Sequence, residues 1–179
     1  MQTHMLEPHP AHPPQAVAGV SVSLGWQPHW LTLRFRIEKA WTVIVPPLAW
    51  RGRADGLWQT TCFEMFVSDG EGPGYAEFNL SPSEQWAAYD FDAPREGMRE
   101  RALAIAPTCT WRGGGPVGFF DAAIPLAALP SFPARLGLTT VIEEQGGAKS
   151  YWALAHGREA PDFHDASCFT AVLAPPEAP

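Results

Sequence analysis

Strict alternation of apolar and polar residues over short segments is the feature that most constrains the fold of this chain. In the segment WLTLRFRIE, residues 30–38, the side chains of Leu31, Leu33, Phe35 and Ile37 fall on one face, and polar or charged side chains fall on the other. Because successive side chains of a β-strand point to opposite faces, this pattern predicts a strand with one buried face. The alternation recurs along the chain, and no segment has a sustained helical stripe.

Glycine and proline divide the chain into short pieces, with 16 glycines and 19 prolines in 179 residues. The sequences GGG (113–115) and QGGAK (145–149) separate strand-like segments, as hairpin loops do. We therefore predict an all-β fold, a single-domain antiparallel β-sandwich of jelly-roll type with roughly nine strands. The predicted domain covers residues 16–174, between a flexible tail rich in proline and histidine at 1–15 and a flexible tail at 175–179.

Composition excludes several classes of protein. The chain has 12 basic and 19 acidic residues, a formal net charge of −7, and no basic run, so we expect no nucleic-acid or membrane partner. The N-terminus has neither a positive start nor an apolar stretch typical of a secretory signal. Three cysteines without a CxxC pair argue against a disulfide framework or a zinc site. The expectation is a cytoplasmic protein, and its protein partners stay undefined.

Residues 57–91 place polar side chains on one face of two neighbouring predicted strands. By alternation, Glu64, Glu77 and Asn79 lie together on the face opposite the core. The core face of these strands is formed by Phe63, Met65, Val67, Phe78 and Leu80.

Two interpretations of the acids remain open from the residues alone. A pair of carboxylates facing one cleft could hydrolyse a glycosidic bond. Alternatively, Glu64 pairs with an arginine such as Arg34 or Arg36 on the polar face, which avoids the cost of a buried charge without a partner.

The chain has 8 tryptophans, a residue that both fills cores and stacks on sugar rings. Trp58 and Trp152 lie beside polar residues near predicted strand ends, which makes them candidates for stacking, whereas Trp41 and Trp50 are predicted to cover the core with a loop. We interpret His156 and His164 as structural hydrogen-bonding residues, since no third metal ligand is fixed by the spacing. No nucleophile elbow, P-loop, dinucleotide fingerprint or HExxH motif is present.

Four segments together resemble the DOMON-like proteins of bacteria, namely LWQTTCFEMFV, YAEFNLSPSEQWAAYDF, PREGM and SYWALAHG with PDFHDASCF. This group is related to family 9 carbohydrate-binding modules and to haem-binding DOMON domains. The resemblance extends from about residue 26 to 172 and implies a β-sandwich whose ligand lies against one sheet or in its end loops. In the sugar branch it implies a slot where tryptophans clamp a sugar while acids, amides and arginines bind its hydroxyls.

The ligand-binding residues that we predict on this basis are Trp58, Glu64, Glu77, Asn79, Arg95, Trp152 and His156. We expect a non-catalytic domain that binds a carbohydrate or sugar-bearing metabolite without a cofactor. The resemblance also implies an alternative, a haem-binding electron-transfer domain in which Met98 pairs with His156 or His164 as axial ligands. A second alternative is an uncharacterised glycoside-type hydrolase that uses Glu64 and Glu77.

Overall fold

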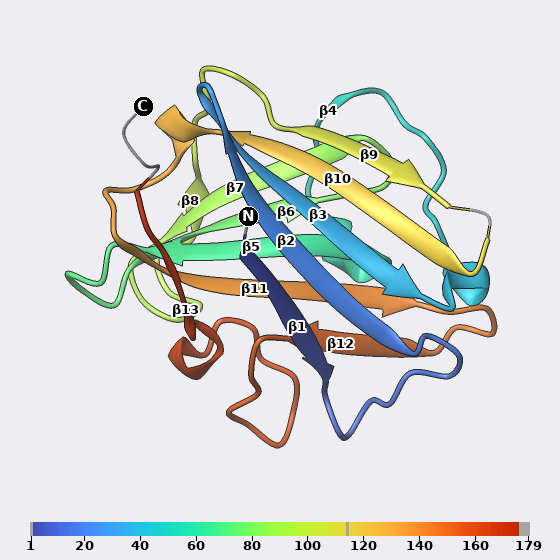
Figure 1. Ribbon diagram of the computed structural model, residues 1–179. Helices are drawn as coiled ribbons and strands as arrows, with labels where there is room; N and C mark the ends of the chain where they lie inside the picture. The colour runs from blue at the N-terminus through green and yellow to red at the C-terminus, as the bar shows by residue number, and fades with distance from the viewer. Residues whose placement is uncertain (1, 114, 176–179) are drawn as a thin grey trace.

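Two layers of β-strands cross one another in this protein (Figure 1). The structure, a computed structural model, describes residues 2–113 and 115–175. Apolar residues at alternate positions build the first layer, because they bury one face of each long strand and leave the other face in contact with water. Its strands, in order across the sheet, are β1 (Gln2–Pro8), β2 (Gly19–Gln27), β3 (Trp30–Glu38), β10 (Val117–Pro125) and β9 (Thr108–Arg112).

The second layer contains the strands that carry the candidate polar residues, and all seven residues of β5 are buried. Both faces of that strand are therefore covered. Its main strands, in order across the sheet, are β7 (Gln85–Phe91), β6 (Tyr75–Leu80), β5 (Cys62–Ser68), β11 (Ala134–Glu143) and β12 (Lys149–Ala153). Three short strands extend this layer: β4 (Gly52–Arg53), β8 (Arg99–Glu100) and β13 (Ala171–Leu173).

Strand β1 joins the two layers and corrects the predicted flexible tail at residues 1–15. It pairs with β2 over five residues, and its end pairs with β12 through Glu7 and Pro8. The side chain of Leu6 points into the core. Burying this side chain and pairing the backbone groups of two neighbouring strands hold the segment in place. The predicted tail at 175–179 falls outside the described residues except for residue 175.

One core lies between the layers. The ring of Phe63 in β5 stacks on Phe120 in β10, with 4.1 Å between ring centroids, and lies 4.9 Å from the ring of Phe35 in β3. The predicted core residues of β5 and β6 are all buried in this cluster, so that prediction is confirmed.

The fold is all-β, as predicted. Among residues 2–113 and 115–175 there is no α-helix, only single 3₁₀ turns at Ala40–Thr42, Leu57–Gln59, Leu126–Ala128 and Ala166–Cys168. No helix in this part of the chain has the length and apolar character needed to cross a membrane. Within the described residues the sheet contains thirteen strands rather than nine, eleven along one hydrogen-bonded path with β8 and β13 paired beside it, and it is mixed because β4 runs parallel to β7. The jelly-roll topology stays a prediction.

A second apolar cluster covers the outer face of the second layer, on the side away from the core. Side chains of β5, β6 and β7 supply its base, including Phe66, Tyr75 and Phe91. Phe163 and Phe169, from the long connection between β12 and β13, pack over it. The outer face is therefore roofed by loops rather than open to solvent, and the candidate polar residues lie beneath these loops.

Candidate functional site

A cavity of about 870 Å³ lies on the outer face of the second layer. This volume is within the range of pockets that hold small molecules. Strands supply part of its lining, through Glu64, Phe66, Glu77, Asn79, Tyr89, Phe91, Val141 and Tyr151. Loops supply the rest of the wall, including a tryptophan at the rim and a histidine from the connection after β12.

Two glutamates lie close together in the lining. Glu64 in β5 is paired with Asn79 in β6, and Glu77 is paired with Phe66, so the two acids are diagonal neighbours across the strand pair. Both are buried, with exposed fractions of 3% and 6%. The Thr139 hydroxyl donates to Glu64 Oε2 at 3.1 Å, and Asn79 Nδ2 donates to Glu77 Oε1 at 2.9 Å.

Burial raises the pKa of both acids. For Glu64 the loss of solvent is the larger cause of the raised pKa, and the nearby Glu77 charge adds to it. For Glu77 the loss of solvent outweighs the hydrogen bond from Asn79 and the Arg95 charge, which act in the opposite direction. Both shifts are in the same direction, so near neutral pH the cavity favours a state in which the pair of acids keeps a proton.

Asn79 presents an acceptor without a donor. Its amide nitrogen is directed at Glu77, whereas its Oδ1 atom is buried and has no hydrogen-bond partner within the described residues. The residue is 1% exposed and lines the cavity. A buried carbonyl without a partner costs free energy, so this atom is a point where a ligand donor would be stabilising.

His164 and Tyr75 form a hydrogen-bonded pair beside Glu77. Tyr75 Oη accepts from the Arg95 backbone N–H at 3.3 Å and lies within hydrogen-bond distance, 2.6 Å, of His164 Nδ1. The other ring nitrogen, Nε2, lies 3.8 Å from Glu77 Oε2, so the tautomer with its proton on Nε2 directs an N–H at that carboxylate and accepts from the phenol. The rings of Phe66 and Phe91 pack edge-on against the imidazole.

Burial lowers the pKa of His164 to about 4, with a further contribution from Arg95. The imidazole is therefore neutral near pH 7. Burial also raises the pKa of Tyr75 to about 12, so the phenol keeps its proton. This pair therefore supplies neutral hydrogen-bonding groups and no positive charge to the acids.

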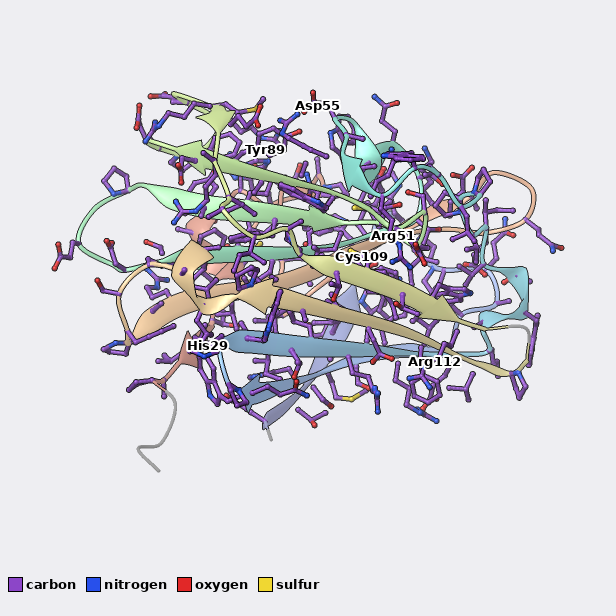
Figure 2. The ribbon with its side chains drawn as sticks, turned by 90° about the horizontal axis from the view of Figure 1, so that it is seen from above. His29, Arg51, Asp55, Tyr89, Cys109 and Arg112 are labelled. Carbon is purple, nitrogen blue, oxygen red and sulfur yellow. The ribbon has the colours of Figure 1, made fainter. Side chains whose placement is uncertain are left out.

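At the rim, each charged residue has a partner from the chain. Tyr89 donates to Asp55, and Figure 2 shows the two labelled residues near one another at one edge of the molecule. Arg53 Nη2 contacts Asp55 Oδ1 at 2.9 Å. Across the cavity, Arg95 Nη2 contacts Asp162 Oδ1 at 2.9 Å. These ion pairs bridge strands and loops, and they neutralise the rim.

Five of the seven predicted ligand-binding residues line this cavity: Trp58, Glu64, Glu77, Asn79 and Arg95. Their predicted role in binding is not tested by this placement.

Trp152 and His156 do not line the cavity. Trp152 is on the inner face of β12, buried in the core, where its Nε1 donates to Ser150 Oγ at 2.9 Å. Its neighbour Tyr151 has the opposite orientation and lines the cavity. His156 Nε2 donates to the Glu7 carbonyl at 2.9 Å and so fixes the end of β1. Trp152 therefore lies on the opposite face of the strand from this cavity, and the predicted aromatic clamp has no contribution from Trp152 at this site.

The arginine alternative for Glu64 is also wrong. Arg34 pairs with Asp121 at 2.6 Å and Arg36 pairs with Glu38, both on the first layer. Trp41 and Trp50 are exposed rather than packed over the core.

Sequence reasoning gave no binding role to Tyr75 or Tyr89, and it predicted His164 only as a structural residue or as an axial ligand in the haem alternative. Alternation could have included both tyrosines, since they share the outer face with Glu77. His164 is in an irregular connection, where no periodicity indicates which way a side chain points.

The residues do not fit axial haem ligation. Met98 and His164 line the cavity, but the histidine directs one nitrogen at Tyr75 and the other at Glu77. His156 lies outside the lining. Within the described ranges, no group of three or more histidine, cysteine, aspartate or glutamate residues is arranged to hold a metal ion.

No family model matches this chain, and no curated protein matches it either. Among solved structures, it is similar to a protein from Bacteroides uniformis described as a candidate carbohydrate-binding protein. The TM-score is 0.66 at 16% sequence identity, over 94% of this chain and 84% of that one. A family 9 carbohydrate-binding module from Caldicellulosiruptor kristjanssonii, solved with glucose, has a TM-score of 0.46 at 11% identity, over 83% and 74% of the two chains. At such identities the first likeness concerns the fold alone, and the DOMON-like resemblance stays a prediction.

Proposed function

We propose that this chain is a non-catalytic binding domain for a small polar ligand, a carbohydrate or sugar-bearing metabolite, held in the cavity above β5 and β6. The observation that carries this proposal is the set of buried acceptors in the lining, Glu64, Glu77 and Asn79, with more acceptor atoms than the chain has donors to fill. Ligand hydroxyl or amino groups would supply the missing donors.

The aromatic wall supports the same proposal. Trp58 lines the cavity with an exposed side chain, and its broad apolar face suits stacking on the C–H face of a sugar. Tyr151 and Phe163 line the cavity from other elements. Polar acceptors with aromatic walls are the combination that recognition of an amphipathic ring requires. The Bacteroides uniformis neighbour shares the fold, and its description as carbohydrate-binding agrees with this proposal. We also propose that the strands have jelly-roll topology and that the chain belongs to the DOMON-like group.

The test is calorimetric titration of the protein with mono- and disaccharides, combined with a thermal-shift screen of the same compounds. We expect at least one sugar to bind, and Trp58→Ala to weaken its binding by about tenfold or more, which corresponds to about 1.4 kcal/mol. Trp50→Ala is the matched control, because Trp50 is also an exposed tryptophan but does not line the cavity. Equal binding by both variants would locate the ligand elsewhere, and no binding by any sugar would contradict the proposal.

A second candidate is hydrolysis of a glycosidic bond by Glu64 and Glu77. The raised pKa of each acid favours it, because a general acid must hold its proton near neutral pH. Binding is the better-supported function, since a retaining pair needs one acid ionised as nucleophile, whereas both pKa values here are raised. Product release from oligosaccharides that is lost in Glu64→Gln would establish hydrolysis instead.

A further inference from the structure

Among the described residues, no arginine or lysine contacts the acid pair in the cavity, although the Arg95 charge acts on both acids from farther away. Arg95 is the arginine in the lining, and its guanidinium is held by Asp162. Asp55 at the rim has Arg53. His164 approaches Glu77, but burial keeps the imidazole neutral. Among the described residues, no lysine or arginine lies within 4.0 Å of either glutamate in an ion pair, and their hydrogen-bond donors are a threonine hydroxyl and an asparagine amide.

Two buried acids without a counter-ion are costly to ionise. Folded proteins normally pair buried charges, because removing a charge from water costs several kcal/mol when nothing compensates for it. In the protein without ligand, protonation of the acids removes the negative charge instead. A bound cation would do so better, because it attracts both carboxylates at once and can donate hydrogen bonds to them.

The number of acceptors also favours a cation of one particular kind. The Oδ1 atom of Asn79 is buried and has no partner in the described chain, and Asn79 is in the same lining as Glu64 and Glu77. This atom is an observation independent of the acids. An ammonium group has three N–H donors and no acceptor, so these three residues can satisfy all of its donors. A hydroxyl has a single donor and would leave two of the three residues without a new hydrogen bond.

The walls suit the rest of such a ligand. Tyr89 and Trp58 line the cavity, and aromatic faces attract cations as well as apolar ring faces. The cavity of about 870 Å³ has room for much more than an ammonium group, so a ring bearing the amine can be enclosed with it.

We propose that the ligand carries a protonated primary amine, bound by Glu64, Glu77 and Asn79, and that amino sugars are therefore preferred over neutral sugars. This inference rests on the proposed function and narrows its ligand class.

Matched pairs of ligands test the inference: glucose with glucosamine, galactose with galactosamine, and cellobiose with the glucosamine disaccharide. Titrations are run at about pH 6.5, below the pKa of an ordinary amine. We expect at least one amino sugar to bind about tenfold or more tightly than its neutral partner. We also expect proton release on binding, measured by calorimetry in buffers of different ionisation enthalpy, since the cation displaces a proton from the acid pair.

Variants of the two glutamates test whether their charge, rather than their shape, determines the preference for the amine. Glu64→Gln and Glu77→Gln should each reduce the preference for the amine, whereas Glu38→Gln, which removes an acid on the first layer, should leave it unchanged. Equal affinity within every pair, with both ligands lost in Trp58→Ala, would overturn the amine inference and leave the proposed function in place. If neither member of any pair binds, both are overturned.

Discussion

Glu64 combines near-complete burial with the lack of a counter-ion, and this has a consequence for stability. Its pKa in the folded protein is raised above the ordinary value of 4.5, first by burial and then by Glu77. The stability that this acid contributes is present in full at pH values below its pKa in the unfolded chain. It is lost as the pH rises through its pKa in the folded protein. The ionised Glu64 carboxylate is therefore destabilising near neutral pH when no ligand is bound.

Glu64→Gln should increase the free energy of unfolding at about pH 7 by roughly 1–2 kcal/mol, because the amide keeps the shape without a buried charge. The carbonyl of the glutamine can still accept from the Thr139 hydroxyl. At about pH 4 the native acid is protonated in both states, so the two proteins should have nearly equal stability. Urea denaturation at the two pH values measures the difference.

The control for this prediction is Glu38→Gln, which removes a half-buried acid of the first layer and should change the free energy by less than about 0.5 kcal/mol at either pH. A loss of stability in Glu64→Gln at neutral pH would mean that the carboxylate has a stabilising partner.

At the scale of elements, β1 is the strand whose contribution is least evident from the sequence. One side of it faces the core through Leu6, while the neighbouring Met5 is 66% exposed. Leu6→Ala should lower the free energy of unfolding by about 2–3 kcal/mol, since it leaves a cavity between the layers. Met5→Ala in the same strand should cost less than about 0.5 kcal/mol. Denaturant unfolding of the two variants measures this difference, and equal small effects would show that the segment is loosely attached.

How far the sequence predicts each element depends on how clearly it alternates. The segment 30–38 alternates four times without interruption, and β3 has the same bounds. In β1 Leu6 is the one fully buried side chain, and the prolines and histidines that follow obscure the strand. In β12 the adjacent aromatic residues Tyr151 and Trp152 fit either face equally well, so composition could not decide which of them points into the core.

The candidate site was predictable where strands build it and not where loops do. Glu64, Glu77 and Asn79 are on regular strands, so their common face followed from parity. The contacts of Arg95 with Asp162 and of Tyr75 with His164 join segments 67 and 89 positions apart in the sequence. No local pattern fixes contacts across such separations, since they depend on how irregular connections pack over the sheet.

At the scale of the whole molecule, the side chain of Glu144 ties the connection between β1 and β2 to the end of β11. Its carboxylate accepts from the backbone N–H groups of Gln15 at 2.7 Å and Ala16 at 2.8 Å, and from the Thr42 hydroxyl at 2.7 Å. The residue is buried. A carboxylate with this many donors holds together segments of both layers.

Burial alone would raise the pKa of Glu144, but the hydrogen bonds to its charged form outweigh burial and lower it below 4.5. Its stabilisation is therefore present above the unfolded pKa and is lost as pH falls through the folded pKa, opposite to the trend for Glu64. Glu144 therefore favours higher pH and Glu64 favours lower pH in the stability of the free protein.

Glu144→Gln should lower the free energy of unfolding by roughly 1–3 kcal/mol at about pH 7, because an amide oxygen accepts these hydrogen bonds less strongly than a carboxylate. The difference from the native protein should shrink as pH falls toward about 3, where the native carboxylate also becomes neutral. Glu143→Gln, which changes the adjacent acid at the end of β11, is the matched control and should cost less than about 0.5 kcal/mol. Urea denaturation over a pH series measures these values. A penalty for Glu144→Gln that is the same at every pH would mean that shape, rather than charge, makes this residue hold the two layers together.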